Sequence, residues 1–427
     1  MSRAELSRAD MSRADGGRAG GGRVEIGLGL QGDKRPGDYA ALAALAEGHG
    51  FDVLSVFGDF MFQPPIVPLL EMAAVTERVR LGAACWTPFS VHPYEIAGQL
   101  AALDLASAGR AYLGLAQGAW LDAVGIRRPR PVRALGEAVE LITALLAGDD
   151  RKLAGEQFPM AAGTRLRCPV HRPRVPVLIG AWGPRMAALA GRVADELKIG
   201  GTANPEMVGV LRSRIAGGAA EVGRRSGDVG IVVGAVTVVD EDEKLARARA
   251  RTEVALYLGE VAHLDPTVTV PPDLLTEVRR RVAEGDQPGA GDLIPDDVLD
   301  LFAFSGTPEQ VAAQARRLID AGVHRVEFGT PHGLTDAGGV PARVARAAPA
   351  GPRLSRPRLQ FFEWRVEIGE ETGGGGCTSA WGCSSRAWTR PGPTARSSGT
   401  SYTWLTRPNP AASARSGPPS TTSPATT

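Results

Sequence analysis

The chain has 427 residues, of which 43% are hydrophobic, so it is long enough to bury a large core. Its formal net charge of +1 provides no basic surplus of the kind that indicates binding to nucleic acid or to an anionic membrane. No apolar run approaches the roughly 18 residues of a membrane span, and the four cysteines are too scattered for a disulfide framework or a zinc site. These properties favour a cytoplasmic enzyme that binds neither nucleic acid nor membrane.

Residues 1–23 form a polar segment at the start of the chain. The unit Ser-Arg-Ala followed by an acidic residue begins at Ser2, Ser7 and Ser12, and a glycine-rich run follows it. The segment lacks the apolar periodicity of a helix or a strand, so we expect a disordered leader.

From Val24 onward, short apolar runs alternate with amphipathic segments, as in parallel strands joined by crossover helices. The predicted strands are 24–30, 53–57, 79–84, 111–116, 177–179, 196–199, 229–239 and 325–328. The predicted helices are 38–47, 65–76, 93–106, 133–147, 183–193, 206–225, 243–258 and 307–320. About eight such units within 24–338 predict an α/β fold, a (β/α)8 or TIM barrel, which usually takes about 250 residues before insertions. An open doubly wound sheet is the alternative.

Two segments exceed a minimal barrel. Residues 150–174 are polar and contain proline, and residues 263–300 combine proline and glycine with a short charged helix predicted over 274–284. We interpret both as loop insertions, the usual place for a lid or for a contact between subunits.

The composition changes abruptly after about residue 339. The last 88 residues contain 11 Arg and 4 Glu, and no acidic residue follows Glu371. The segment shows no helix or strand period. We therefore expect residues 339–427 to be either a disordered extension or a tail translated out of frame.

Candidate functional residues follow the ends of the second and third strands, since a barrel carries its chemistry at the C-terminal ends of its strands. Asp59 comes directly after the second strand, where it either caps a loop or contacts a cofactor or substrate. Residues 82–84 are small enough to admit a flat ring, and Trp86 and Thr87 offer a stacking face and a hydroxyl. The alternative is tight packing at the barrel rim, with Cys85 as a small buried residue.

A candidate phosphate site lies where the fifth strand leads into a helix beginning near Gly183. Free backbone N–H groups and the positive end of that helix attract an anion, and Arg185 adds charge. A glycine-rich turn with a solvated arginine explains the segment equally well. Residues 176–185 do not contain the Gly-x-Gly-x-x-Gly fingerprint of dinucleotide binding. His92, before Pro93, is expected to cap a helix rather than to act as a base.

Taken in order, these motifs resemble those of the bacterial luciferase-like superfamily, the flavin- and deazaflavin-dependent oxidoreductases built on a (β/α)8 barrel. The resemblance extends over about residues 24–338. The matching segments are Asp59, 81–88 with His92 and Pro93, 105–110, 114–118, 180–185, 190–195, 305–309 and 321–323.

The resemblance implies that a flavin-type ring lies across the barrel mouth, with its phosphate beside residues 180–185. It also implies a non-prolyl cis peptide between Ala84 and Cys85. Members of the superfamily often dimerise, so the resemblance implies a homodimer as well. The cofactor-binding residues that it implies are Asp59, Ala84, Cys85, Trp86, Thr87, Gly114, Gly118, Gly180, Ala181, Gly183, Pro184 and Arg185.

Within the superfamily, the chain resembles the coenzyme F420 branch near the methylenetetrahydromethanopterin reductases. It departs from the branch at Phe60, where a histidine is common, at Val91, where an arginine is common, and at Ala119, where sugar-phosphate dehydrogenases carry an acid. These departures argue against sugar-phosphate oxidation and leave no assigned proton donor. We therefore predict hydride transfer between F420 and a small organic substrate. The alternatives are a monooxygenase that uses reduced FMN and a catalytically silent flavin-binding barrel.

Overall fold

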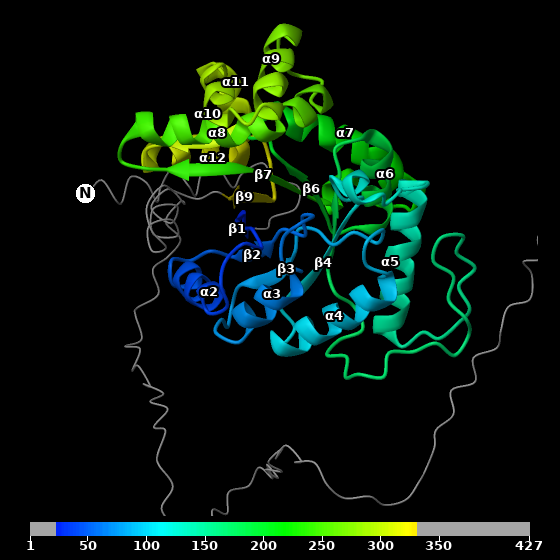
Figure 1. Cartoon of the computed structure of the whole chain (residues 1–427). Helices are drawn as coiled ribbons and strands as arrows, with labels where there is room; N and C mark the ends of the chain where they lie inside the picture. Colours follow the sequence, from blue (N-terminus) through cyan, green and yellow to red (C-terminus); the bar gives the residue numbers. More distant parts are fainter. Residues whose placement is uncertain (1–22, 331–427) are drawn as a thin grey trace, which may run out of the picture. The chain divides into compact units, whose positions relative to one another are not determined.

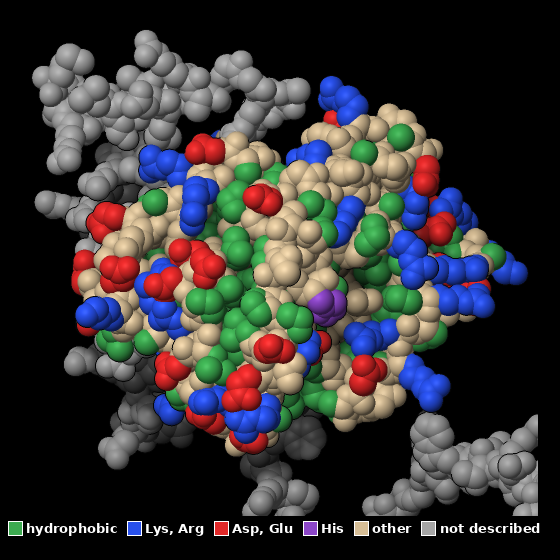
Figure 2. Space-filling model, turned by 90° about the horizontal axis from the view of Figure 1, so that it is seen from above, with side chains coloured by type: hydrophobic (Ala, Val, Ile, Leu, Met, Phe, Trp, Pro, Cys, Tyr) green, Lys and Arg blue, Asp and Glu red, His purple; other side chains and the backbone are tan. Residues whose placement is uncertain are grey.

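The computed structural model of the protein describes residues 23–330 (Figure 1). The predicted tail, and the predicted leader apart from Arg23, lie outside the described residues. Seen from above (Figure 2), acidic and basic side chains lie interspersed among hydrophobic ones on the face in view.

The parallel strands close into a barrel in which each strand pairs with the next along the chain. They are β1 (Glu25–Leu30), β2 (Val53–Val56), β3 (Arg80–Ala83), β4 (Ala111–Ala116), β5 (Val177–Gly180), β6 (Glu196–Gly200), β7 (Gly230–Val239) and β9 (Arg325–Gly329). β9 pairs with β7 on one side and with β1 on the other, which completes the ring. The TIM barrel prediction is confirmed, and the open sheet is excluded because β6 also pairs with β7, so that each of these eight strands has a strand neighbour on both sides.

Helices surround the barrel, and most of them lie where the sequence predicted them (Figure 1). They are α2 (Asp38–Gly48), α3 (Ile66–Ala73), α4 (Pro93–Ala106), α5 (Pro131–Ala147), α6 (Pro184–Val193), α7 (Glu206–Glu221), α8 (Glu243–Val261) and α12 (Pro308–Asp320). Thr307 and Gln310 form a capping box at the start of α12, the helix predicted over 307–320. Within residues 23–330, no helix is both long and apolar enough to cross a membrane.

The second insertion is more ordered than the sequence indicated. It contains the predicted charged helix as α9 (Pro272–Ala283), and in addition α10 (Gln287–Asp292) and α11 (Asp296–Phe302). These helices pack against α8 in a separate hydrophobic cluster that includes Leu258, Val278 and Phe302. The segment therefore has a small core of its own beside the barrel.

A short strand that the sequence analysis missed follows this insertion. β8 (Ala303–Gly306) pairs in parallel with the end of β7, from Val236 to Val239. β7 is long enough to pair with β9 first and with β8 afterwards. A run of four residues is too short for its hydrophobic pattern to indicate a strand. The segment is extended because it pairs with the end of β7 that continues past β9.

The first insertion, residues 150–174, contains no helix and is held to the rest of the protein by apolar contacts of Leu153, Phe158 and Met160 with the main core and by polar contacts. Leu153 and Met160 form an isolated antiparallel bridge. Arg172 pairs with the buried carboxylate of Asp104 at 2.9 Å and donates to the carbonyl of Ala111 at 2.8 Å. The interpretation as a loop insertion agrees with this structure.

Candidate functional site

The inside of the barrel is filled by side chains in layers, because every second residue of a strand faces the interior. The register pairs Glu25 with Arg325 at one level and Gly27 with Glu327 at the next. The layer nearest the N-terminal ends of the strands contains Glu25, Arg80, Glu196 and Arg325, the middle layer contains Ser55, Tyr112, Lys198 and Glu327, and the layer at the mouth contains Phe57 and Cys85.

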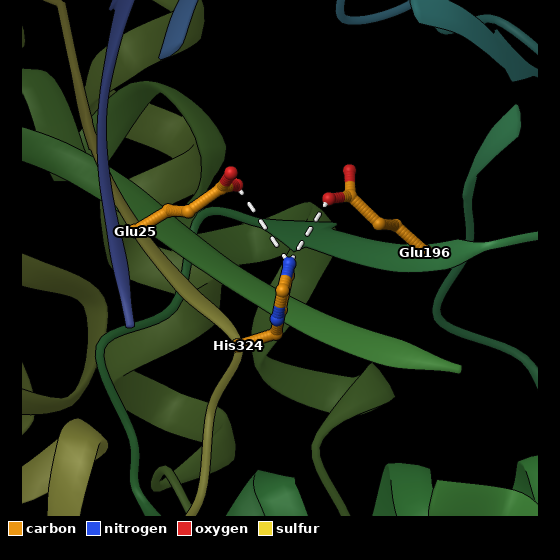
Figure 3. A group of neighbouring side chains, drawn as sticks. All are labelled: Glu25, Glu196 and His324. Atoms are coloured by element: carbon orange, nitrogen blue, oxygen red, sulfur yellow. Dashed lines mark ion pairs between the residues drawn. The ribbon is translucent and has the colours of Figure 1, made fainter. Parts of the chain in front are cut away.

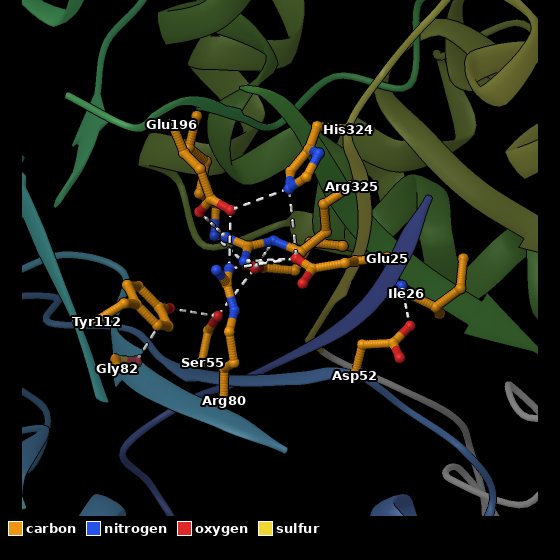
Figure 4. Close-up of polar contacts among 12 residues, drawn as sticks. Glu25, Ile26, Asp52, Ser55, Arg80, Gly82, Tyr112, Glu196, His324 and Arg325 are labelled. Carbon is orange, nitrogen blue, oxygen red and sulfur yellow. Dashed lines mark hydrogen bonds and ion pairs between the residues drawn. The ribbon is translucent and has the colours of Figure 1, made fainter. Parts of the chain in front are cut away.

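The layer at the N-terminal ends is a network of ion pairs (Figures 3 and 4). Glu196 lies 2.8 Å from Arg80, 3.2 Å from Arg325 and 3.4 Å from His324. Burial opposes ionisation of Glu196, but Arg325, His324 and Arg80 outweigh it and hold its pKa below the usual range. Glu25, Glu196 and His324 offer atoms within 4.8 Å of one another that are able to ligate a metal. The arginines already supply their counter-charge, and this end of a barrel usually serves stability.

The middle layer is a chain of buried hydrogen bonds across the barrel (Figure 4). The hydroxyl groups of Ser55 and Tyr112 lie 2.7 Å apart, and Ser55 donates to Oε2 of Glu327 at 2.9 Å. The ammonium of Lys198 is in contact with Oε1 of Glu327. These contacts join β2, β4, β6 and β9, so the polar chain fixes how the barrel interior is filled just beneath the mouth.

The floor of the mouth is formed by Phe57 and Cys85, with glycines around them. A Cβ at Gly29 would lie 2.5 Å from the Phe57 ring, and one at Gly180 would lie 3.1 Å from Sγ of Cys85. A Cβ at Gly200, by contrast, would meet no atom of the described structure within 4 Å. The glycines therefore make room for the two floor side chains, and Gly200, which faces the same way as Lys198 two residues earlier on β6, leaves space that a flat ligand can occupy.

A cis peptide joins Ala84 to Cys85, which confirms the bond that the resemblance implied. Directly after it, the backbone N–H of Trp86 donates to the carbonyl of Gly114 at 2.9 Å and so continues the pairing of β3 with β4. A Cβ at Gly114 would lie only 1.9 Å from the carbonyl oxygen of Ala83. Glycine is required at this position because the two backbones approach so closely.

The candidate cofactor-binding residues after the third strand point in different directions in the structure. Cys85 points to the barrel interior, where burial raises the pKa of its thiol to about 12, so the thiol is neutral. Trp86 is only 2% exposed, and its ring lies in the core between the barrel and the helices. Thr87 is buried near Gly118, whose left-handed backbone has φ of 77°. Trp86 therefore packs tightly in the core, which was the alternative to a stacking face for a cofactor ring.

Asp59 lies just beyond β2 at the rim of the mouth and is half-buried. Burial raises the pKa of its carboxyl group, although a hydrogen bond from Gln31 and the charge of Lys198 oppose the shift. The amide of Gln31 donates to Oδ2 of Asp59 at 3.2 Å. Sequence reasoning missed Gln31, whose only signal was a polar side chain directly after the first strand.

The start of α6 has the features that anion binding requires. The N-cap residue is Gly183, so no N-cap side chain accepts a hydrogen bond from the first turn of the helix. Pro184 occupies that first turn. The N–H groups of a first turn have no partner inside the helix. Gly183, Pro184 and Arg185 are all exposed, and Arg185 makes no ion pair with any residue of the described range 23–330. The carbonyl of Trp182 just before the turn accepts from Arg214 of α7 at 2.5 Å, which holds this loop in place.

His92 caps α4, as the sequence predicted. Its Nδ1 accepts from the backbone N–H of Tyr94 at 3.1 Å, and its ring meets Phe158 edge-on with ring centroids 5.4 Å apart. These contacts account for His92 without a role as a base.

A model of the family described as luciferase-like monooxygenase matches residues 16–325. The chain belongs to the luciferase-like monooxygenase family. It is 31% identical over 300 residues to the 5,10-methylenetetrahydromethanopterin reductase of Archaeoglobus fulgidus, covering 68% of this chain and 88% of that protein. It is 28% identical over 316 residues to an F420-dependent glucose-6-phosphate dehydrogenase of Nocardia farcinica, covering 69% of this chain and 88% of that protein. These matches identify this luciferase-like protein as an enzyme of the oxidoreductase class.

The fold of this luciferase-like protein matches that of a solved structure. The coenzyme F420-dependent tetrahydromethanopterin reductase from Methanopyrus kandleri superimposes with a TM-score of 0.67 at 24% identity. The superposition covers 76% of this chain and 97% of the other. At this level of identity, the match establishes a shared barrel fold.

Proposed function

We propose that the chain is an F420-dependent oxidoreductase that transfers a hydride between the deazaflavin and a small organic substrate. The observation that carries the proposal is the pairing, at one end of the barrel, of a glycine-lined floor with an exposed helix start that lacks a side-chain cap. The choice of F420 is supported by the relative from Nocardia farcinica, whose name contains that coenzyme.

The residues present fit such a cofactor at two places. The free N–H groups at the start of α6, together with the guanidinium of Arg185, suit the phosphate of the cofactor. The open space at Gly200, which lies at the C-terminal end of β6, suits its flat ring. Both places lie at the C-terminal ends of the strands, where barrel enzymes carry their sites.

When bound, the deazaflavin supplies the carbon that gives or receives the hydride. The protein's part is to hold the reacting carbons close together and to keep water away, which the apolar floor of Phe57 favours. Asp59, with its raised pKa, is suited to hold a proton at the rim while Gln31 orients its carboxyl group. The neutral thiol of Cys85 is unsuited to act as a nucleophile.

The test of the phosphate site is a comparison of two arginines on α6. We expect R185A to weaken binding of F420 about tenfold, the lower end of what a hydrogen bond to a charged group contributes. R192A is the matched control, because Arg192 lies at the other end of the helix and pairs with Glu221 at 2.8 Å. Binding is followed by fluorescence titration of F420. Equal affinities for wild type, R185A and R192A would place the phosphate elsewhere.

A second candidate is a monooxygenase that uses reduced FMN, which the description of the matching family favours. The same helix start suits the phosphate of FMN, so R185A alone does not distinguish the two cofactors. We expect the wild-type protein to bind F420 at least tenfold more tightly than FMN. Tighter binding of FMN, together with substrate-dependent oxygen consumption, would replace the first proposal by the second.

A further inference from the structure

Lys198 and Glu327 form a buried ion pair that neither the sequence analysis nor the proposed reaction uses. Their side chains are 8% and 1% exposed, and they project into the barrel from β6 and β9. The interior of a (β/α)8 barrel is usually filled by branched apolar side chains. Burying two charges costs several kcal/mol of desolvation per ion, and apolar residues of similar size often replace such a pair without loss of stability. The pair therefore calls for an explanation beyond packing.

The ammonium of Lys198 lies directly beneath the floor of the mouth. Its Nζ is 5.1 Å from the centroid of the Phe57 ring. Its positive charge also acts on Asp59 and Cys85, where it opposes the effect of burial on both acids. The field of Lys198 thus reaches the rim and the floor from below.

Glu327 holds the ammonium in place but does not cancel it fully. Its carboxylate is shared among Lys198, the hydroxyl of Ser55 at 2.9 Å and Nε of Arg325 at 3.6 Å. Of the described residues, Glu327 alone accepts a hydrogen bond from Nζ of Lys198, although an ammonium has three N–H donors. Among the described residues, no second carboxylate forms an ion pair with the ammonium, whose charge also acts on Asp59 at the rim.

We propose that Lys198 stabilises the negative charge that the cofactor ring acquires on reduction, and that Glu327 is the positioning residue that keeps Lys198 beneath the ring. The inference rests on the proposed function. The transfer moves two electrons and one hydrogen nucleus from a substrate C–H bond to a new C–H bond on the ring, which becomes more negative by one charge. The substrate hydroxyl or amine loses the remaining proton to Asp59 or to water. A fixed cation near that charge favours reduction without having to rearrange.

The test measures the midpoint potential of F420 bound to the variant K198M. Methionine keeps most of the side-chain length and removes the charge. We expect the affinity for reduced F420 to fall at least tenfold relative to that for oxidised F420. This ratio corresponds to a drop of about 30 mV in the potential of a two-electron couple. K198R keeps the charge, so its ratio of affinities for reduced and oxidised F420 is expected to stay within threefold of the wild-type ratio.

Y112F is the matched control, because it removes a hydroxyl from the same layer without changing its charge. We expect its bound potential to equal that of the wild type. Since K198M leaves Glu327 with fewer partners and is at risk of unfolding, K198M/E327Q provides a second variant that leaves neither charge of the pair behind. It too is expected to lower the potential, by less than K198M does.

The two proposals fail in different ways. If wild-type protein binds no F420 in the fluorescence titration, the proposed function is wrong. If the wild type binds F420 but K198M and K198M/E327Q both keep the ratio of affinities for reduced and oxidised F420 within threefold of the wild-type ratio, the role of Lys198 is refuted. A drop in the midpoint potential of bound F420 in Y112F as large as that in K198M would likewise refute the role of Lys198, because packing rather than charge would then set the potential.

Discussion

Gly114 provides the sharpest test of how the mouth is built. The variant G114A adds one methyl group, whose carbon would lie 1.9 Å from the carbonyl oxygen of Ala83. A backbone oxygen cannot turn away as a side chain can, so β3 and β4 must move apart locally. Overpacking of this kind costs roughly 1–3 kcal/mol and occasionally more. We expect about 3 kcal/mol here, because a rigid backbone group is the obstacle.

The described residues 23–330 unfold with an entropy of about 2.1 cal/mol/K per residue, so 1 kcal/mol shifts the midpoint of thermal unfolding by roughly 1.5 °C and G114A should lower it by about 5 °C. The assay is thermal unfolding of the cofactor-free protein, followed by circular dichroism. G98A is the control: Gly98 lies within α4, and an added Cβ would meet no described atom within 4 Å. Alanine there should raise stability by up to about 1 kcal/mol. A midpoint for G114A within 2 °C of the wild type would refute the argument from close backbone approach.

Two further predictions concern carboxyl groups. Burial raises the pKa of Asp59, so the folded state holds the proton of its carboxyl group more tightly than the unfolded state does. The melting temperature of the wild type relative to that of D59N should therefore fall as the pH rises above the usual carboxyl range. A difference in melting temperature that stays constant from pH 4 to 8 would contradict this. Glu47 behaves in the opposite way, because its carboxylate accepts backbone N–H bonds from Glu77, Arg78 and Val79, which outweigh burial and lower its pKa. E47Q should lower the free energy of unfolding in urea by about 1–3 kcal/mol at pH 7. This loss should shrink as the pH falls through the pKa of Glu47 in the folded protein. A loss independent of pH would show that the backbone N–H groups do not depend on the charge of Glu47.

The sequence by itself determined the order of the strands and helices. Alternating apolar and amphipathic segments are local patterns, so the eight barrel strands appear within one residue of their predicted ends. The capping residue Thr307 and the turn at Gly183 are local signals as well, and both begin helices as expected. The eight barrel strands and the fold class were therefore accessible from the sequence, whereas β8, α10 and α11 were not.

Only the tertiary structure decided which side chains meet inside the barrel. Lys198 and Glu327 are far apart in the chain and look like polar interruptions of two strands, but barrel closure brings them into contact. Trp86 and Cys85 are neighbours in the chain, yet one faces the helices and the other the barrel interior. β8 is extended because the end of β7 provides an edge. In each case the deciding contact joins residues distant in the chain, and local propensity carries no information about such a contact.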